Sequence, residues 1–290
     1  MFRILGKSLA ILFVTCAHLV MYGALLGIIG EPHSDFEFVL YISMPFADVG
    51  VLGFWLVVGS HRAWLRLMVA IVGFCTILAC GVNAMDLHPM VLGPAYATTL
   101  SSVALGTLGL GCVAAYFPGW RGWQVRFALW EIIAATCLIA VALAILRAIT
   151  VNDLLNWQAW VGKEGREFLT FSVTSGFFLA VAGLPILAVG GKVRVLSILA
   201  TVPLMASVPS LEIWLFQLFG MGTPEYGMLF KAHVLQLAFA WGTLVPLRWA
   251  FPGLVQAWHR ADESVVNEET SKSPNISANE KTSEDFFEMK

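Results

Sequence analysis

An aspartate and a histidine are spaced so that they could meet in the middle of a membrane. Asp48 lies at the centre of the apolar run 38–58, three residues after Pro45, and His18 lies about eleven residues into the preceding apolar run, 8–29. At about 1.5 Å of rise per residue, both side chains reach the midplane if the two runs are antiparallel helices. Ionisable groups at that depth are costly and suggest a function. The pair predicts either a proton or cation relay or a hydrogen bond that holds two helices together.

A second polar group is expected near the outer surface. Glu212 follows Pro203 and Pro209 within one apolar run, and Lys231 and His233 begin the next run. The connection between these runs is short, so Glu212 and His233 are expected at similar depth. Two prolines in one span indicate a bent or broken helix, and such helices often line cavities in transporters. The alternative is a Glu–Lys or Glu–His pair near the interface, with the lysine extending its amine toward water.

Imidazole and carboxylate side chains also occur in the connections between apolar runs. His33, Asp86 and His88 fall on the predicted outer rim, and His233 could join them there. These are ligand types that suit zinc or iron. Their spacing matches no defined metal motif, so the sequence predicts no metal site, and these residues are kept as candidates for an enzyme with a metal on its outer face.

The composition indicates the fold class that holds these side chains in place. Of 290 residues, 58% are hydrophobic and 12% are charged, with a mean hydropathy of +0.78. A soluble domain carries about 25% charged residues. A membrane-spanning helix needs roughly 20 apolar residues, and backbone groups in lipid must bond within their own segment. The sequence therefore predicts an all-α, polytopic membrane helix bundle of about eight spans, at 8–29, 38–58, 67–85, 91–117, 127–149, 169–189, 195–219 and 229–251.

The connections predict the orientation and the domain boundary. With the N-terminus inside, the inner side carries ten Lys and Arg residues and the outer side carries four, apart from the distal tail. That asymmetry predicts a cytoplasmic location for both termini. The long connection 150–168 has apolar residues on one face of a possible short helix, expected on the outer surface. Residues 1–260 form the predicted bundle, and the acidic, Ser-rich residues 261–290 form a predicted disordered cytoplasmic tail.

Two short segments carry a resemblance to known sequences. Arg126-Phe127-Ala128-Leu129-Trp130-Glu131-Ile132-Ile133 resembles the start of a span in many uncharacterised bacterial multi-pass inner-membrane proteins, whose usual form is Arg-Phe-Ser-Leu-Arg. The chain departs from that form at Ala128 and Trp130. The stretch 56–66 is weakly similar to the end of a span in such proteins. Together the two segments cover about a tenth of the chain. The resemblance implies a bacterial cytoplasmic membrane and carries no activity and no site residues.

Three classes of function remain open from the sequence. The first is a non-catalytic membrane component, alone, as a homo-oligomer or with a membrane-protein partner. The second is a carrier for a proton, ion or small solute that uses His18 with Asp48 and Glu212 with His233. The third is a membrane enzyme with an outer-face metal. No nucleotide-binding loop, hydrolase elbow or His-Glu-x-x-His motif occurs. We expect no cofactor and no nucleic-acid partner; the lipid bilayer is the expected environment.

Overall fold

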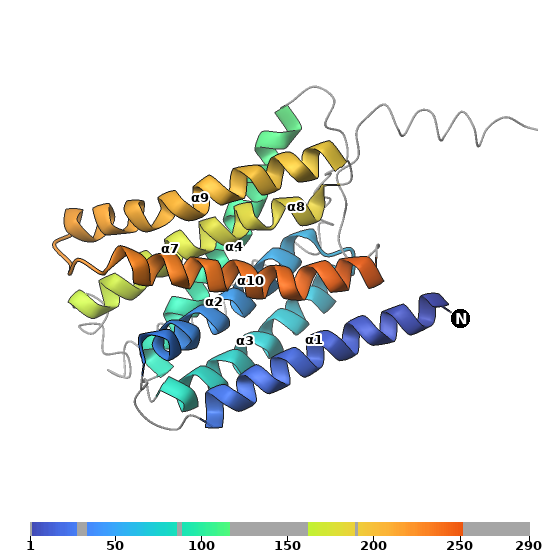
Figure 1. Ribbon diagram of the computed structural model, residues 1–290, viewed down its shortest axis with the longest axis horizontal. Coiled ribbons are helices and arrows are strands. Elements are labelled where there is room, and N and C mark those ends of the chain that lie inside the picture. Colours follow the sequence, from blue (N-terminus) through green and yellow to red (C-terminus); the bar gives the residue numbers. More distant parts are fainter. Residues whose placement is uncertain (1, 28–33, 86–88, 117–161, 189–190, 252–290) are drawn as a thin grey trace, which may run out of the picture.

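The computed structural model describes residues 2–27, 34–85, 89–116, 162–188 and 191–251, and these form an all-α bundle (Figure 1). Seven of the described helices are long and apolar enough to cross a membrane, which confirms the predicted polytopic bundle. The elements are α1 (Phe2–Gly27), α2 (Asp35–Val58), α3 (Ala63–Met85), α4 (Pro89–Tyr116), α7 (Lys163–Ala182), α8 (Leu184–Leu187), α9 (Gly191–Leu218) and α10 (Tyr226–Ala250).

Some predictions fall outside the described residues, and others need adjustment. The predicted span 127–149, the acidic tail 261–290 and residues 150–161 of the predicted surface helix are not among the described residues. Residues 163–168, which the sequence placed in that connection, form the first turns of α7. The prolines Pro203 and Pro209 lie inside one continuous helix, α9, so of the two predicted alternatives, a bent or a broken helix, the break is not observed and the bend stays a prediction.

Four helices that run in the same direction make up the interior. In the contacts between α2 and α4, between α4 and α7 and between α7 and α10, residues further along one helix contact residues further along the other, so the helices of each pair are parallel. A predicted span between α4 and α7 is consistent with their parallel direction. The pairs that define these directions are Phe46–Tyr96 and Gly53–Leu100, Thr99–Ser172 and Gly106–Ala180, and Ser175–Gln236 and Ala182–Trp241.

The helices α1, α3 and α9 run in the opposite direction and present large apolar side chains outward. On α1, for example, Leu12, Leu19 and Val20 are exposed, and α9 exposes Leu196 and Leu199. In water such a surface would favour aggregation, whereas lipid is an equivalent apolar solvent. The pattern of exposure therefore agrees with the span assignment made from composition.

Small residues bring α4 and α7 together. A side chain added at Gly176 of α7 would meet Ser102 Cβ and would lie 3.0 Å from Thr99 O, both on α4. Close backbone approach through Gly, Ser and Thr is the usual way that helices associate in lipid. The span α4 is rich in such small residues, and α7 is the helix that it packs against at this contact.

Substitution of Gly176 by valine is expected to destabilise the bundle. Inserting methyl groups into this contact forces the two helices apart, at a cost of about 1–3 kcal/mol. Gly109 on α4 provides the matched control, because a side chain added there meets no atom within 4 Å. The measurement is the free energy of unfolding of each purified variant in mixed micelles. Equal losses for Gly176→Val and Gly109→Val would contradict the assigned contact.

Arg66 joins the start of α3 to the end of α2. Its Nη1 donates to the carbonyls of Leu56 at 2.7 Å and Val57 at 3.0 Å. The last carbonyls of a helix have no partner within the helix, and a cationic donor both satisfies them and complements the helix dipole. The buried guanidinium therefore closes the end of α2 and fixes the turn to α3.

A tight turn sets the relative depth of α9 and α10. Gly220 follows α9 with φ +64°, and Met221 N donates to Phe216 O at 2.8 Å. Such a left-handed residue after a helix favours glycine and ends the helix by satisfying a terminal carbonyl. Glu167 of α7 accepts from Gly222 N at 3.0 Å and ties the turn to the bundle. Residues at similar distances from this turn consequently lie at similar depth.

Candidate functional site

The His18–Asp48 pair lies between α1, α2 and α10. His18 Nε2 is 3.1 Å from Asp48 Oδ1, and Tyr22 donates its hydroxyl to Asp48 Oδ2 at 2.8 Å. Thr243 Oγ1 of α10 lies 3.4 Å from His18 Nε2. Asp48 is 8% exposed, and the His18 side chain is 31% exposed. The aspartate is thus enclosed by protein, while the histidine reaches toward the bundle surface.

The partners of His18 define where its hydrogens must be. Nδ1 lies 2.8 Å from Val14 O, and a backbone carbonyl can only accept, so Nδ1 carries a hydrogen. The contact between Nε2 and the carboxylate then needs a second hydrogen, on either the ring or Asp48. The pair therefore holds one shared proton and has no net charge. A neutral pair is the form that a low-dielectric interior tolerates best.

The second pair, Glu212 with His233, is fully enclosed. Both side chains are 0% exposed, and His233 Nε2 lies 3.0 Å from Glu212 Oε2. Thr174 of α7 donates to the other carboxylate oxygen, Glu212 Oε1. Gln236 and Ser175 continue the group, because His233 Nδ1 is 3.1 Å from Gln236 Oε1 and Gln236 Nε2 donates to Ser175 Oγ at 3.2 Å. Three helices, α7, α9 and α10, therefore supply one continuous hydrogen-bonded cluster.

The same reasoning places a shared proton on this pair. Since the Gln236 amide nitrogen donates to Ser175, the amide oxygen faces His233 Nδ1 and accepts its hydrogen. The short contact between His233 Nε2 and Glu212 then needs a further hydrogen. Phe171 stacks on the imidazole with ring centroids 5.9 Å apart, and Phe178 meets its edge at 5.0 Å. The imidazole is therefore enclosed between aromatic rings, and neither member of the pair is exposed.

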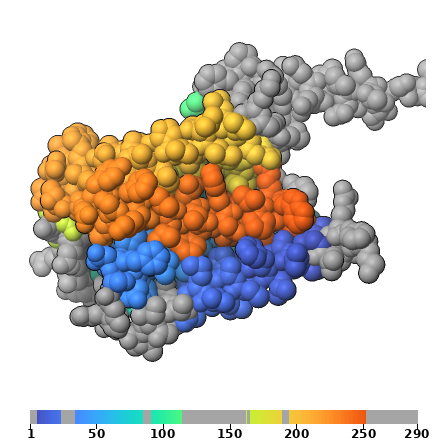
Figure 2. Space-filling view, in the orientation of Figure 1, coloured from blue at the N-terminus to red at the C-terminus, as the bar shows by residue number. Residues whose placement is uncertain are grey.

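Both pairs are attached to one face of α10. His233, Gln236, Ala240 and Thr243 follow one another at spacings of three and four residues and are all buried. Seven residues of helix, about 10 Å, separate Gln236 from Thr243. Figures 1 and 2 show α10 lying between α9 on one side and α1 on the other, which is how it reaches both pairs. On this face, the apolar residue Ala240 lies between Gln236 and Thr243.

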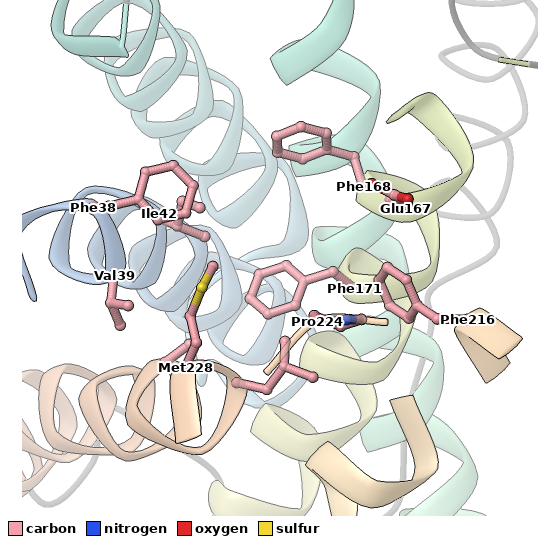
Figure 3. A pocket seen from close by; sticks show the side chains of 11 residues that line it. Phe38, Val39, Ile42, Glu167, Phe168, Phe171, Phe216, Pro224 and Met228 are labelled. Carbon is pink, nitrogen blue, oxygen red and sulfur yellow. The ribbon is translucent and has the colours of Figure 1, made fainter. Parts of the chain in front are cut away.

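A cavity of about 230 Å³ opens above the Glu212–His233 pair. It lies between α2, α7 and α10, and its walls are almost entirely apolar, with Glu167 as the one carboxylate in its lining. Figure 3 shows Phe171 and Met228 pointing toward one another from α7 and α10. Because the ring of Phe171 lines the cavity and also stacks on His233, it is the side chain that separates the cavity from the pair.

The structure brings together most, but not all, of the residues selected from the sequence. His18 meets Asp48, and Glu212 meets His233. Lys231 is exposed and is not among the residues that contact Glu212 in the described part of the chain, so the proposed Glu–Lys alternative is not observed. The candidate metal ligands His33, Asp86 and His88 lie outside the described residues. Within the described ranges, no three His, Cys, Asp or Glu side chains are grouped as a metal site.

Several polar partners were missed from the sequence. Tyr22 follows His18 by four residues, so helical periodicity could have placed it on the same face. Thr243 lies two helical turns after Gln236, and the 3–4 spacing along α10 was again available. Thr174 and Ser175 gave no such signal, because nothing in the sequence placed α7 against α9 and α10.

Comparison of the chain with protein-family models, with curated proteins and with solved structures finds no match.

Proposed function

We propose that this protein is a membrane carrier for protons, in which two histidine–carboxylate pairs bind the transported proton. The observation that carries the proposal is that both proton-sharing pairs contact one buried face of α10: His233 belongs to it, and Thr243 lies 3.4 Å from His18. Ionisable groups inside spans are costly and mark proton or substrate pathways in many membrane proteins. Two such pairs along one helix would give a transported proton two binding positions at different depths.

A carrier fits this arrangement better than an open channel. Ala240 separates the pairs, and Phe171 closes the outer cavity over His233. A proton could pass only after these contacts open, as alternating access requires.

The test is proton flux into sealed vesicles that contain the purified chain. With a pH-sensitive dye inside and a potassium-driven voltage across the membrane, the protein is expected to accelerate pH equilibration well beyond that of protein-free vesicles. The driving voltage and the lipid are the same in both samples. Equal rates with and without the protein, at several external pH values, would contradict proton transport.

The second candidate is a non-catalytic membrane component. It is favoured by the complete hydrogen bonding of Glu212, His233 and Gln236, which would suit pairs that only hold α7, α9 and α10 together. In that case the vesicles would show no protein-dependent flux, and both pairs would contribute to stability alone.

We propose further that the protein lies in a bacterial cytoplasmic membrane with both termini inside. Lys7 of α1 lies 5.4 Å from the ring of Phe251, directly after α10, which supports a common side for the two ends. The excess of Lys and Arg in the predicted inner connections supports the orientation. A reporter enzyme that is active only outside the cytoplasm, fused after Phe36, is expected to be active; an inactive reporter with normal membrane insertion would reverse the orientation.

A further inference from the structure

A second cavity lies at the opposite end of the bundle from the apolar one. It has a volume of about 490 Å³ and is bordered by α8, the start of α9 and the end of α10. Its lining combines two arginines, Arg194 and Arg248, with the tryptophans Trp241 and Trp249. The described carboxylates that bind protons, Asp48 and Glu212, do not line this cavity. Its chemistry is therefore separate from the proton-binding pairs.

The two arginines converge although they come from different helices. Arg194 of α9 and Arg248 of α10 both donate through Nη2 to the carbonyl of Ala188, at 3.2 Å and 3.1 Å. Within the described ranges no carboxylate forms an ion pair with either guanidinium. Arg248 Nη1 is buried and has no hydrogen-bond partner there. One carbonyl thus satisfies a small part of the donor capacity of two cations, since each guanidinium carries five N–H groups.

We propose that this cavity binds the phosphate headgroup of an anionic phospholipid. Planar guanidinium groups bind phosphate oxygens through paired hydrogen bonds, and basic pockets between spans commonly hold acidic headgroups. A bound phosphate would neutralise the two adjacent positive charges and give Arg248 Nη1 an acceptor.

The apolar part of the lining favours a lipid over a free anion. Ile198, Trp241 and Val245 contribute apolar surface to the cavity beside the arginines. Trp249 is 73% exposed, and Leu196 on the neighbouring turn of α9 is 69% exposed. Tryptophan at a span end is typical of the headgroup region, and exposed leucine is typical of the lipid-facing surface. An acyl chain could therefore lie along α9 while its headgroup occupies the cavity.

The experiment measures lipid binding to the purified full-length chain by native mass spectrometry, with thermal unfolding as a parallel readout. The added probes are phosphatidylglycerol, phosphatidylcholine and inorganic phosphate. The unmodified chain is expected to bind phosphatidylglycerol more tightly than phosphatidylcholine and to respond weakly to inorganic phosphate. The double variant Arg194→Gln/Arg248→Gln is expected to lose about fivefold in phosphatidylglycerol affinity for each arginine removed.

Matched variants separate a binding site from general electrostatics and from misfolding. Arg166→Gln removes an exposed arginine at the other end of the bundle and should leave the lipid preference unchanged. The pair Arg194→Lys/Arg248→Lys keeps both charges and should retain more affinity than the glutamine pair. If the glutamine pair does not fold, Arg194→Gln alone, at an exposed position, provides the comparison.

Three results would overturn the proposal. Phosphatidylglycerol and phosphatidylcholine binding with equal affinity, or an unchanged preference in the folded glutamine variants, would show that the arginines serve only to hold the Ala188 carbonyl. A response to inorganic phosphate as large as that to phosphatidylglycerol would assign the cavity to a free anion and exclude the lipid.

Discussion

Replacing His233 by leucine is expected to lower the free energy of unfolding by about 3–5 kcal/mol, the usual cost of removing one partner from a buried charged pair. Glu212 and His233 are both 0% exposed, so neither can turn to water when the other is removed. Leucine fills a similar volume but supplies neither a hydrogen nor a positive charge to Glu212, and it leaves Gln236 Oε1 without a donor.

The loss of stability in His233→Leu is expected to require the presence of Glu212 and the burial of the substituted position. In the double variant Glu212→Leu/His233→Leu no carboxylate remains in the core, so much of the stability should return. His61→Leu is the control for the same substitution at an exposed position and should change stability by less than about 0.5 kcal/mol. Unfolding would be followed in mixed micelles by loss of helical circular dichroism. Losses that simply add in the double variant would show that the two residues are not energetically coupled.

Replacing Asp48 by asparagine is expected to abolish proton-driven flux while leaving the fold intact. Asparagine can donate to His18 Nε2 and accept from Tyr22, so each hydrogen bond of the aspartate has a neutral counterpart. Stability should change by no more than about 1 kcal/mol, since hydrogen bonds between spans are worth about 0.6 kcal/mol on average. The shared proton, however, is lost, and removing a positioned proton-transfer group slows transfer by about a hundredfold or more.

Proton flux into vesicles and unfolding in micelles would be measured on the same preparations. Asp35→Asn is the matched control, because Asp35 lies in the first turn of the same helix and is exposed. It should keep normal flux. A correctly folded Asp48→Asn variant that transports protons at the normal rate would exclude this pair from the pathway and leave it as a contact between helices.

The depth of a side chain in the membrane was predictable from the sequence, whereas the helices that pack side by side were not. A fixed rise per residue and a short connection place His18 level with Asp48, and the turn at Gly220 does the same for Glu212 and His233. These are local constraints along the chain. That α10 packs between α9 and α1, and that α7 supplies Thr174 to Glu212, depends on which faces of non-consecutive helices fit together. Composition and hydropathy carry little information about that fit, because every face of a span is apolar.

The effect of the two prolines in α9 also depends on local packing. Two prolines remove two backbone hydrogen bonds from α9, yet the helix continues from Gly191 to Leu218. The carbonyls left without a helical donor are those four residues before each proline, at Leu199 and Met205. Tyr226 donates to the neighbouring carbonyl of Ala206 at 2.8 Å and joins this part of α9 to α10. The loss of one backbone bond at each proline therefore does not end the helix in this packed setting.

The parallel direction of α2, α4, α7 and α10 gives the core an electrical polarity. Each helix places roughly half a positive charge at its first turn and half a negative charge at its last. Because this charge acts mainly within one turn of the helix end, it is concentrated at the two ends of the core. Arg66, which donates to the last carbonyls of α2, and Arg248, in the last turn of α10, lie at the negative end. His233 and Thr243 lie about two turns from the two ends of α10, so the helix ends favour cations at one end of the core and have little effect on the two histidine–carboxylate pairs.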